Sequence, residues 1–199
     1  MRVDDMRVRI FKGLLAGMMI SLGCTVYLKI GGIVGAILFS IGLLGVVTYQ
    51  LNLFTGKAGF LDLNWRGIRE IGSILLLNVI GVFFTAFMIG HMTPDLVNGC
   101  NSIIQKRIEF GLDRTFIASI FCGVMMSLAI TGILKYNNSI FIPLLFAVPC
   151  FILSGFYHCI ADAFYFVLSG FEICDYWIVW IVTVAGNWVG CNLQRLIKC

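Results

Sequence analysis

Six long apolar segments cover most of this 199-residue chain, and they limit its fold more than any other feature. Windows of about 19 residues, the length of helix that crosses a bilayer, place them at residues 11–28, 30–50, 71–89, 116–134, 140–155 with a continuation to about 168, and 177–197. Hydrophobic residues make up 60% of the chain and charged residues 12%, against roughly 45–50% and 25% in soluble domains. We therefore predict one all-α integral membrane domain, residues 1–199, with six transmembrane helices in a lipid bilayer.

The distribution of basic residues predicts the orientation of this domain. With the N-terminus inside, nine Arg and Lys residues lie on the inner side, and four lie on the outer side, at positions 29, 106, 107 and 114. This excess predicts that both termini are cytoplasmic and that the protein lies in the cell's inner (plasma) membrane. The polar stretch at residues 91–114 is then an outer loop with room for a short helix.

Composition also argues against several partners. The net charge of +4 is small and the basic residues are scattered, so we expect no nucleic-acid binding. Most of the eight cysteines lie in apolar runs, without CxxC or Cys/His zinc spacing, and behave there as small hydrophobes. We therefore expect no disulfide framework, no metal site and no cofactor, and the first apolar segment has no clear signal-peptide cleavage site.

The two halves of the chain resemble each other. Residues 16–22 (AGMMISL) are echoed by residues 122–128 (CGVMMSL), and residues 78–81 (NVIG) are echoed by residues 187–190 (NWVG). Three spans in each half mean that the halves insert with opposite topology. We therefore predict two inverted three-helix repeats, at about residues 10–92 and 114–197.

Two polar interruptions occupy matching places in these repeats. Residues 155–162 (GFYHCIAD) put a histidine and an aspartate inside apolar sequence, where a charged group costs about 2.5–3.5 kcal/mol. Residues 50–57 (QLNLFTGK) interrupt the first repeat at the corresponding position. Non-helical backbone at membrane depth survives only inside protein or along a cavity. The sequence thus predicts that the second and fifth helices are broken and that the breaks form one central site.

Four motifs resemble the formate/nitrite transporter family over nearly the whole chain. They are the Leu-Ala-Gly at residues 15–17 followed by Gly23, the Asn-Leu-Phe-Thr-Gly at 52–56, the Gly-Phe-Tyr-His-Cys-Ile-Ala-Asp-Ala-Phe at 155–164 and the Gly-Asn-Trp-Val-Gly at 186–190. The resemblance implies an aquaporin-like protomer in a homopentamer that carries a small monovalent anion. Formate is the first expectation, with nitrite and hydrosulfide as alternatives.

The resemblance also assigns positions along a pathway. It implies a cytoplasmic constriction at Phe39, Leu43 and Leu53, and a periplasmic one at Phe54, Met126 and Phe151. Between them it places the loop threonine, Thr55, and a central histidine, His158. Further candidates come from the interruptions, from the sixth-helix motif and from departures from the family pattern: Asn52, Lys57, Asn187, Tyr157 (usually Glu), Asp162 (usually Asn) and Gly123 (at the apparent position of a fourth-helix Asn).

The chemistry of these residues supports proton-assisted passage. A bare anion loses its hydration shell in a ring of Phe and Leu, whereas a neutral weak acid pays far less. An imidazole at His158 has the unperturbed pKa for giving a proton to the anion. Thr55 supplies a hydroxyl donor without a fixed charge.

Other interpretations stay open. An aquaporin-like pore for neutral solutes would normally need paired Asn-Pro-Ala loops, which this sequence does not contain. An integral membrane enzyme could use His158 with Cys159 and Asp162, but one central histidine without a second catalytic cluster makes an enzyme the weaker hypothesis. Asp162 could instead bond the backbone freed by the break, and Lys57 could extend its ammonium to the inner interface rather than attract anions.

Overall fold

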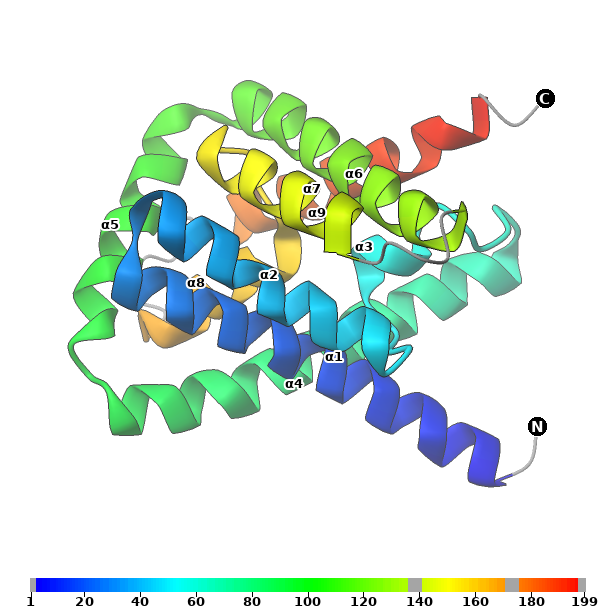
Figure 1. Cartoon of the computed structure of the whole chain (residues 1–199), viewed down its shortest axis with the longest axis horizontal. Helices are drawn as coiled ribbons and strands as arrows, with labels where there is room; N and C mark the ends of the chain where they lie inside the picture. Colours follow the sequence, from blue (N-terminus) through cyan, green and yellow to red (C-terminus); the bar gives the residue numbers. More distant parts are fainter. Residues whose placement is uncertain (1–2, 136–140, 171–175, 197–199) are drawn as a thin grey trace.

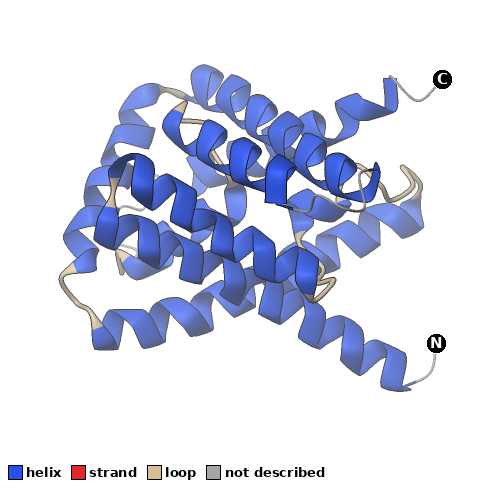
Figure 2. Cartoon of the chain, viewed as in Figure 1, coloured by secondary structure: helices blue, strands red, loops and turns tan. Residues whose placement is uncertain are grey.

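The computed structural model describes residues 3–135, 141–170 and 176–196, and Figure 2 shows these as helices joined by short loops, with no strand. In these residues the elements are α1 (Val3–Ile30), α2 (Gly32–Thr48), α3 (Phe54–Lys57), α4 (Trp65–Met92), α5 (Leu96–Phe110), α6 (Leu112–Lys135), α7 (Phe141–Leu153), α8 (Cys159–Leu168), α9 (Tyr176–Asn192) and a 3₁₀ turn, η1 (Leu193–Leu196). The all-α prediction is confirmed.

Within the part of the chain that the structure describes, three helices are long and apolar enough to cross a membrane by themselves. They are Asp5–Ile30, Trp65–Met92 and Leu112–Ile133, which correspond to the first, third and fourth predicted spans. The second span, residues 30–50, corresponds to α2, and the short helix α3 follows it after a break; the fifth span is divided into α7 and α8. A 17-residue helix such as α2 is only about 25 Å long, short of the roughly 30 Å hydrocarbon core. The prediction that the second and fifth spans are broken is confirmed.

The structure differs from the sequence expectations at the edges of the spans. The first helix begins at Val3 rather than at residue 11. The polar stretch expected to be mainly loop forms the 15-residue helix α5, whose buried residues Leu96, Cys100 and Ile104 recur every fourth position. This spacing gives α5 one apolar face, which docks on the bundle. The predicted span limits at residues 140 and 197 lie outside the described residues.

The helices of the two halves run in opposite directions. In Figure 1, α1 and α4 run one way, whereas α6 and α9 run the other way. The N- and C-termini lie at the same end of the molecule, and α5 crosses the opposite end. These directions agree with the predicted inverted repeat.

Glycines let the long helices of each half approach closely. A Cβ atom at Gly17 would overlap the carbonyl of Asn78, and one at Gly123 would overlap the carbonyl of Asn187. The first pair joins α1 to α4 and the second joins α6 to α9, so the two halves repeat the same contact. Gly123 therefore serves helix packing, which explains why a larger residue does not occupy this position.

Candidate functional site

The two breaks meet at the centre of the molecule. Thr55, in the short helix α3, places its Oγ1 atom 2.9 Å from Nε2 of His158, which caps α8. Both side chains are buried, with 1% and 2% of their surface exposed. The structure therefore brings together the two residues that the sequence placed at the centre of the pathway.

Asn78 of α4 holds the first break in place. Its Oδ1 accepts the backbone N–H of Phe54 at 2.8 Å. Its amide nitrogen donates to the carbonyls of Asn52 and Gly13, both at 2.8 Å. One buried side chain thus satisfies backbone groups on both sides of the break and ties them to α1, as buried polar groups require.

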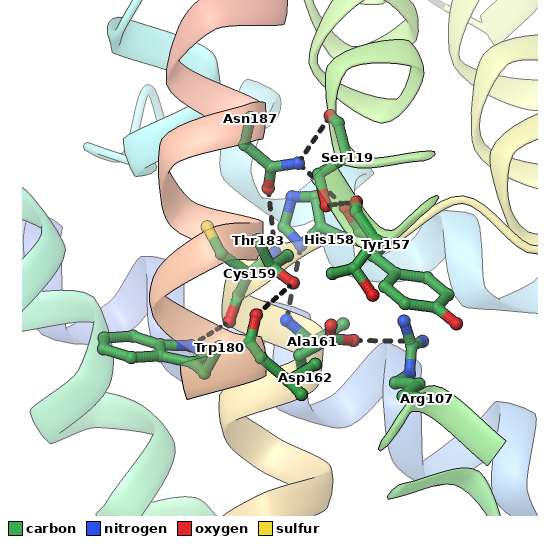
Figure 3. A network of polar contacts seen from close by, with 12 residues as sticks. Arg107, Ser119, Tyr157, His158, Cys159, Ala161, Asp162, Trp180, Thr183 and Asn187 are labelled. Atoms are coloured by element: carbon green, nitrogen blue, oxygen red, sulfur yellow. Dashed lines mark hydrogen bonds and ion pairs between the residues drawn. The ribbon is translucent and has the colours of Figure 1, made fainter. Parts of the chain in front are cut away.

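Asn187 of α9 makes the same set of bonds at the second break (Figure 3). Its Oδ1 accepts the backbone N–H of Cys159 at 2.9 Å. Its amide nitrogen donates to the carbonyl of Tyr157 at 2.8 Å and to that of Ser119, in α6, at 2.9 Å. Because these bonds use both N–H groups of its amide, Asn187 positions the break and has no free donor for a passing solute.

The backbone fixes which nitrogen of His158 carries the proton. The Nδ1 atom lies 3.3 Å from the backbone nitrogen of Ala161 and accepts its N–H. A backbone N–H can only donate, so the neutral ring carries its proton on Nε2 and directs it at Thr55. The Thr55 hydroxyl, accepting there, keeps its own proton for a further acceptor. A proton added at Nδ1 would break the bond to Ala161, so this geometry favours the neutral ring.

A cavity of about 410 Å³ leads to His158 from the end of the bundle that α5 crosses. Its lining comes from α1, α2, α5, α7, the second break and α8: Tyr27, Phe39, Ile103, Lys106, Arg107, Phe110, Phe151, Ile152, Ser154, Gly155, Phe156, Tyr157, His158, Ala161 and Tyr165. Its lining is therefore mostly apolar and aromatic, with Lys106, Arg107, Ser154 and His158 as the exceptions.

Two phenylalanines narrow this cavity next to the histidine. The rings of Phe39 and Phe151 meet edge to face with centroids 6.1 Å apart, and Phe151 stacks on His158 at 5.7 Å. Phe39 thus lines the cavity on the α5 side together with Phe151. Its expected role in a cytoplasmic constriction with Leu43 and Leu53 stays a prediction.

The other residues expected at the constrictions are buried but do not line this cavity. Leu43, Leu53, Phe54 and Met126 belong to the hydrophobic core, each with 3% or less of its surface exposed. The constriction on the side away from α5 stays a prediction.

A buried ion pair lies one turn beyond the histidine. Nη2 of Arg107, in α5, is 3.0 Å from Oδ1 of Asp162, whose side chain has no exposed surface. The guanidinium carbon of Arg107 also lies 3.9 Å from the ring centroid of Tyr157. Asp162 therefore neutralises Arg107, and Figure 3 shows the two side chains directed toward each other.

Two further candidates contribute less to the site. Asn52 supplies backbone, accepting from Asn78 through its carbonyl and donating its N–H to the carbonyl of Lys12 at 3.2 Å. Lys57 is the last residue of α3 and is partly exposed. Neither residue lines the cavity on the α5 side.

Sequence reasoning did not place Asn78 among the candidate site residues, and it did not predict that Arg107 would pair with Asp162. For Asn78 a signal was present, since its motif is repeated around Asn187. For the pairing of Arg107 the sequence contained little signal, because this pairing depends on where α5 docks. Arg107 lies 55 positions before Asp162 in the chain.

The model of the formate/nitrite transporter family matches residues 4–194. The chain belongs to this family. It is therefore a multi-pass membrane protein of a family of channels and transporters, as the sequence motifs indicated.

Individual relatives agree with this membership. The "Uncharacterized transporter YrhG" of Bacillus subtilis (strain 168) is 24% identical in an alignment of 178 positions, and the match covers 76% of this chain and 67% of the relative. A solved structure described as "Pentameric formate channel with formate bound" has a TM-score of 0.87 at 18% identity, covering 99% of this chain and 97% of that one. Another, described as "FNT family ion channel", has a TM-score of 0.91 at 18% identity, covering 98% and 92%. At these identities the structures show a shared fold.

Proposed function

We propose that this protein is a homopentameric membrane channel or transporter for a small monovalent anion, with formate as the leading substrate and nitrite or hydrosulfide as alternatives. The observation that carries the proposal is the buried Thr55–His158 contact at the junction of two broken helices, at the end of a cavity narrowed by Phe39 and Phe151. The pentameric formate channel that shares this fold supports both the assembly and the substrate.

The proposed passage uses the polar centre between apolar rings. An anion that passes from the cavity beyond His158 would meet the Thr55 hydroxyl, which can donate because its oxygen already accepts from His158. The N-terminus of α8, beginning at Cys159, adds the partial positive charge of a helix dipole. Together these groups stabilise a negative charge without a fixed cation that would hold it.

Proton assistance follows from the cost of desolvation. An anion crosses a ring of phenylalanine only at a high cost, and the neutral acid crosses at a much lower one. In our proposal, Nε2 of the protonated His158 ring passes its proton to Thr55 as the Thr55 hydroxyl gives its own proton to the anion, which leaves a neutral ring protonated on Nδ1. Protonation at Nε2 and loss of the Nδ1 proton then restore the tautomer that accepts from Ala161. Thr55 and His158 therefore act as one donor unit.

Formate uptake into proteoliposomes, followed with an internal pH indicator, tests this proposal. His158→Asn removes the titratable group, and we expect uptake to fall to about a tenth or less, the factor that the loss of about 1.4 kcal/mol produces. The chain's other histidine, the exposed His91, provides the matched control, and His91→Asn should transport as the wild type does. Unchanged formate uptake by His158→Asn would contradict the role of the histidine.

The same assay separates the alternatives. A pore for neutral solutes would pass glycerol or water at a rate independent of an acid gradient. Competition of formate with nitrite and with hydrosulfide ranks the three anions. If none of them enters faster through the wild type than through protein-free liposomes, anion transport itself is refuted.

A further inference from the structure

We infer that Arg107 and Asp162 act as one electrically neutral unit in the wall of the approach to His158, and that this neutrality lets a monovalent anion pass without being retained. The inference rests on the proposed anion passage. It assigns to Asp162 the role of a positioning and charge-balancing residue that acts through Arg107.

The pair is placed where an unbalanced charge would matter. Asp162 follows His158 by one helical turn, and its backbone N–H donates to the His158 carbonyl at 2.9 Å. The carboxylate itself is fully buried and does not line the cavity, whereas Arg107 does. The Asp162 carboxylate thus lies outside the cavity, 3.0 Å from the Arg107 guanidinium. It offsets the positive charge that an anion in the cavity would otherwise meet.

Several contacts fix the guanidinium in this position. It lies over the ring of Tyr157, with 3.9 Å between its central carbon and the ring centroid, and Tyr157 in turn contacts Phe110 with centroids 5.6 Å apart. Its Nε and Nη1 atoms are buried and have no hydrogen-bond partner in the described part of the chain. Arg107 is therefore anchored by Asp162 and Tyr157, two residues at which the sequence departs from the family pattern.

The remaining fixed charge of the cavity lies in water. Among the described residues that line it, Lys106 and Arg107 carry fixed charges, and Lys106 is exposed. Solvent screens an exposed charge, whereas a buried one acts at full strength through its low-dielectric surroundings. The buried part of the approach is neutral only as long as Arg107 and Asp162 are both present.

Removing Asp162 and removing Arg107 should have opposite effects on the affinity for the anion. Without Asp162, the mostly buried Arg107, with 14% of its side chain exposed, is an uncompensated cation, which binds the anion more tightly and releases it more slowly. Without Arg107, the buried Asp162 is an uncompensated anion, which repels the substrate. A conducting pathway needs binding strong enough for the ion to enter and weak enough for it to leave, so each change should lower the maximal rate.

The test is anion uptake into proteoliposomes as a function of formate concentration. Asp162→Asn should lower the half-saturating concentration by about threefold or more, and Arg107→Gln should raise it by about as much. The double variant Arg107→Gln/Asp162→Asn should return it to within about twofold of the wild type, because removing both buried charges leaves neither unpaired. Arg114→Gln, which removes an exposed positive charge outside the cavity, is the control for net charge.

A purely structural pair predicts a different pattern. If the ion pair only anchors α5, both single variants shift the half-saturating concentration in the same direction. The half-saturating concentration of the double variant is then no closer to that of the wild type than those of the single variants. This result would overturn the inference. The variants Asp162→Glu and Arg107→Lys keep both charges and should rescue the wild-type half-saturating concentration even where a neutral variant fails to assemble. If Asp162→Glu and Arg107→Lys shift the half-saturating concentration as much as the neutral variants do, the inference is also refuted. A wild type that carries no anion refutes the proposed function instead.

Discussion

At the scale of single residues, the centre of the molecule is one hydrogen-bonded pair contributed by two distant segments. Thr55 and His158 are 103 positions apart in the chain, yet their side chains meet at 2.9 Å. The Ala161 N–H fixes the ring tautomer, and the ring in turn fixes the acceptor role of the Thr55 oxygen. The orientation of a small hydroxyl is therefore set by a helix cap.

Removal of the Thr55 hydroxyl should impair transport without disturbing the fold. Thr55→Val keeps the shape of the side chain but loses the donor, and a lost hydrogen bond of about 1 kcal/mol or more corresponds to a rate reduced by roughly fivefold to tenfold. Formate uptake into proteoliposomes measures the change, and Thr55→Ser should restore most of it.

Another buried threonine provides the comparison. Thr85 bonds only to a carbonyl of its own helix, that of Gly81, so Thr85→Val should leave uptake close to that of the wild type. Equal uptake by Thr55→Val and Thr85→Val would show that the hydroxyl at Thr55 has no part in transport.

The motif sequences predicted both Thr55 and His158, and the matched interruptions predicted that they would meet. They could not predict the partner of Asp162, because this partner comes from α5, a helix in a stretch expected to be mostly loop. They also could not show that Phe39 would meet Phe151 beside His158, since spacing gives a position along a helix but no contact partner. Local patterns thus located Thr55 and His158, whereas tertiary docking decided which charges and rings surround them.

At the scale of elements, the two broken helices depend on the long helices beside them. Asn78 of α4 and Asn187 of α9 each bind the backbone N–H of the first residue of a half-helix and the carbonyl two positions before it. Each amide also reaches the first long helix of its own half, at Gly13 or Ser119. The sequence predicted the two interruptions. It signalled the side chains that stabilise them only through an asparagine that recurs in both halves.

Loss of either asparagine should destabilise the protein to a similar extent. Asn78→Ala and Asn187→Ala each leave three buried backbone groups without a partner, at a cost of about 1–3 kcal/mol per group. We expect the apparent melting temperature in detergent to fall by several degrees in both variants. Gln105→Ala, which removes an exposed amide from α5, should change it little.

The equality of the two effects is the informative part of this experiment. Similar losses would show that the two halves are stabilised in the same way. A large loss for one variant with none for the other would contradict the equivalence that the hydrogen bonds indicate.

At the scale of the whole molecule, the two halves build one site from opposite directions. Corresponding long helices run antiparallel, both termini lie at one end and α5 covers the other (Figure 1). The apolar segments and the internal echo predicted this plan, since bilayer thickness sets span length and an odd number of spans per half reverses the second half. The length of α5 was not predicted, because a polar amphipathic helix lacks the hydropathy signal of a span.

Accessibility labelling tests the predicted orientation of the molecule in the membrane. Gln105 is exposed on α5, and we expect a membrane-impermeant maleimide to label Gln105→Cys from outside intact cells. A tag at the C-terminus should be reached only after the cells are opened, because nine inner and four outer basic residues favour cytoplasmic termini. Wild-type protein gives the background labelling of the native cysteines, and the reverse pattern would invert the orientation.

The asparagine bonds have a mechanical consequence. Asn78 bonds the first break to α4, and Asn187 bonds the second break to α9. Thr55 and His158 can therefore separate only if α4 and α9 move apart or if several of these buried hydrogen bonds break together. The Thr55–His158 contact is thus held in place from both sides by buried hydrogen bonds. In the proposed pathway, we therefore expect any opening and closing at the two ends, one of which α5 covers.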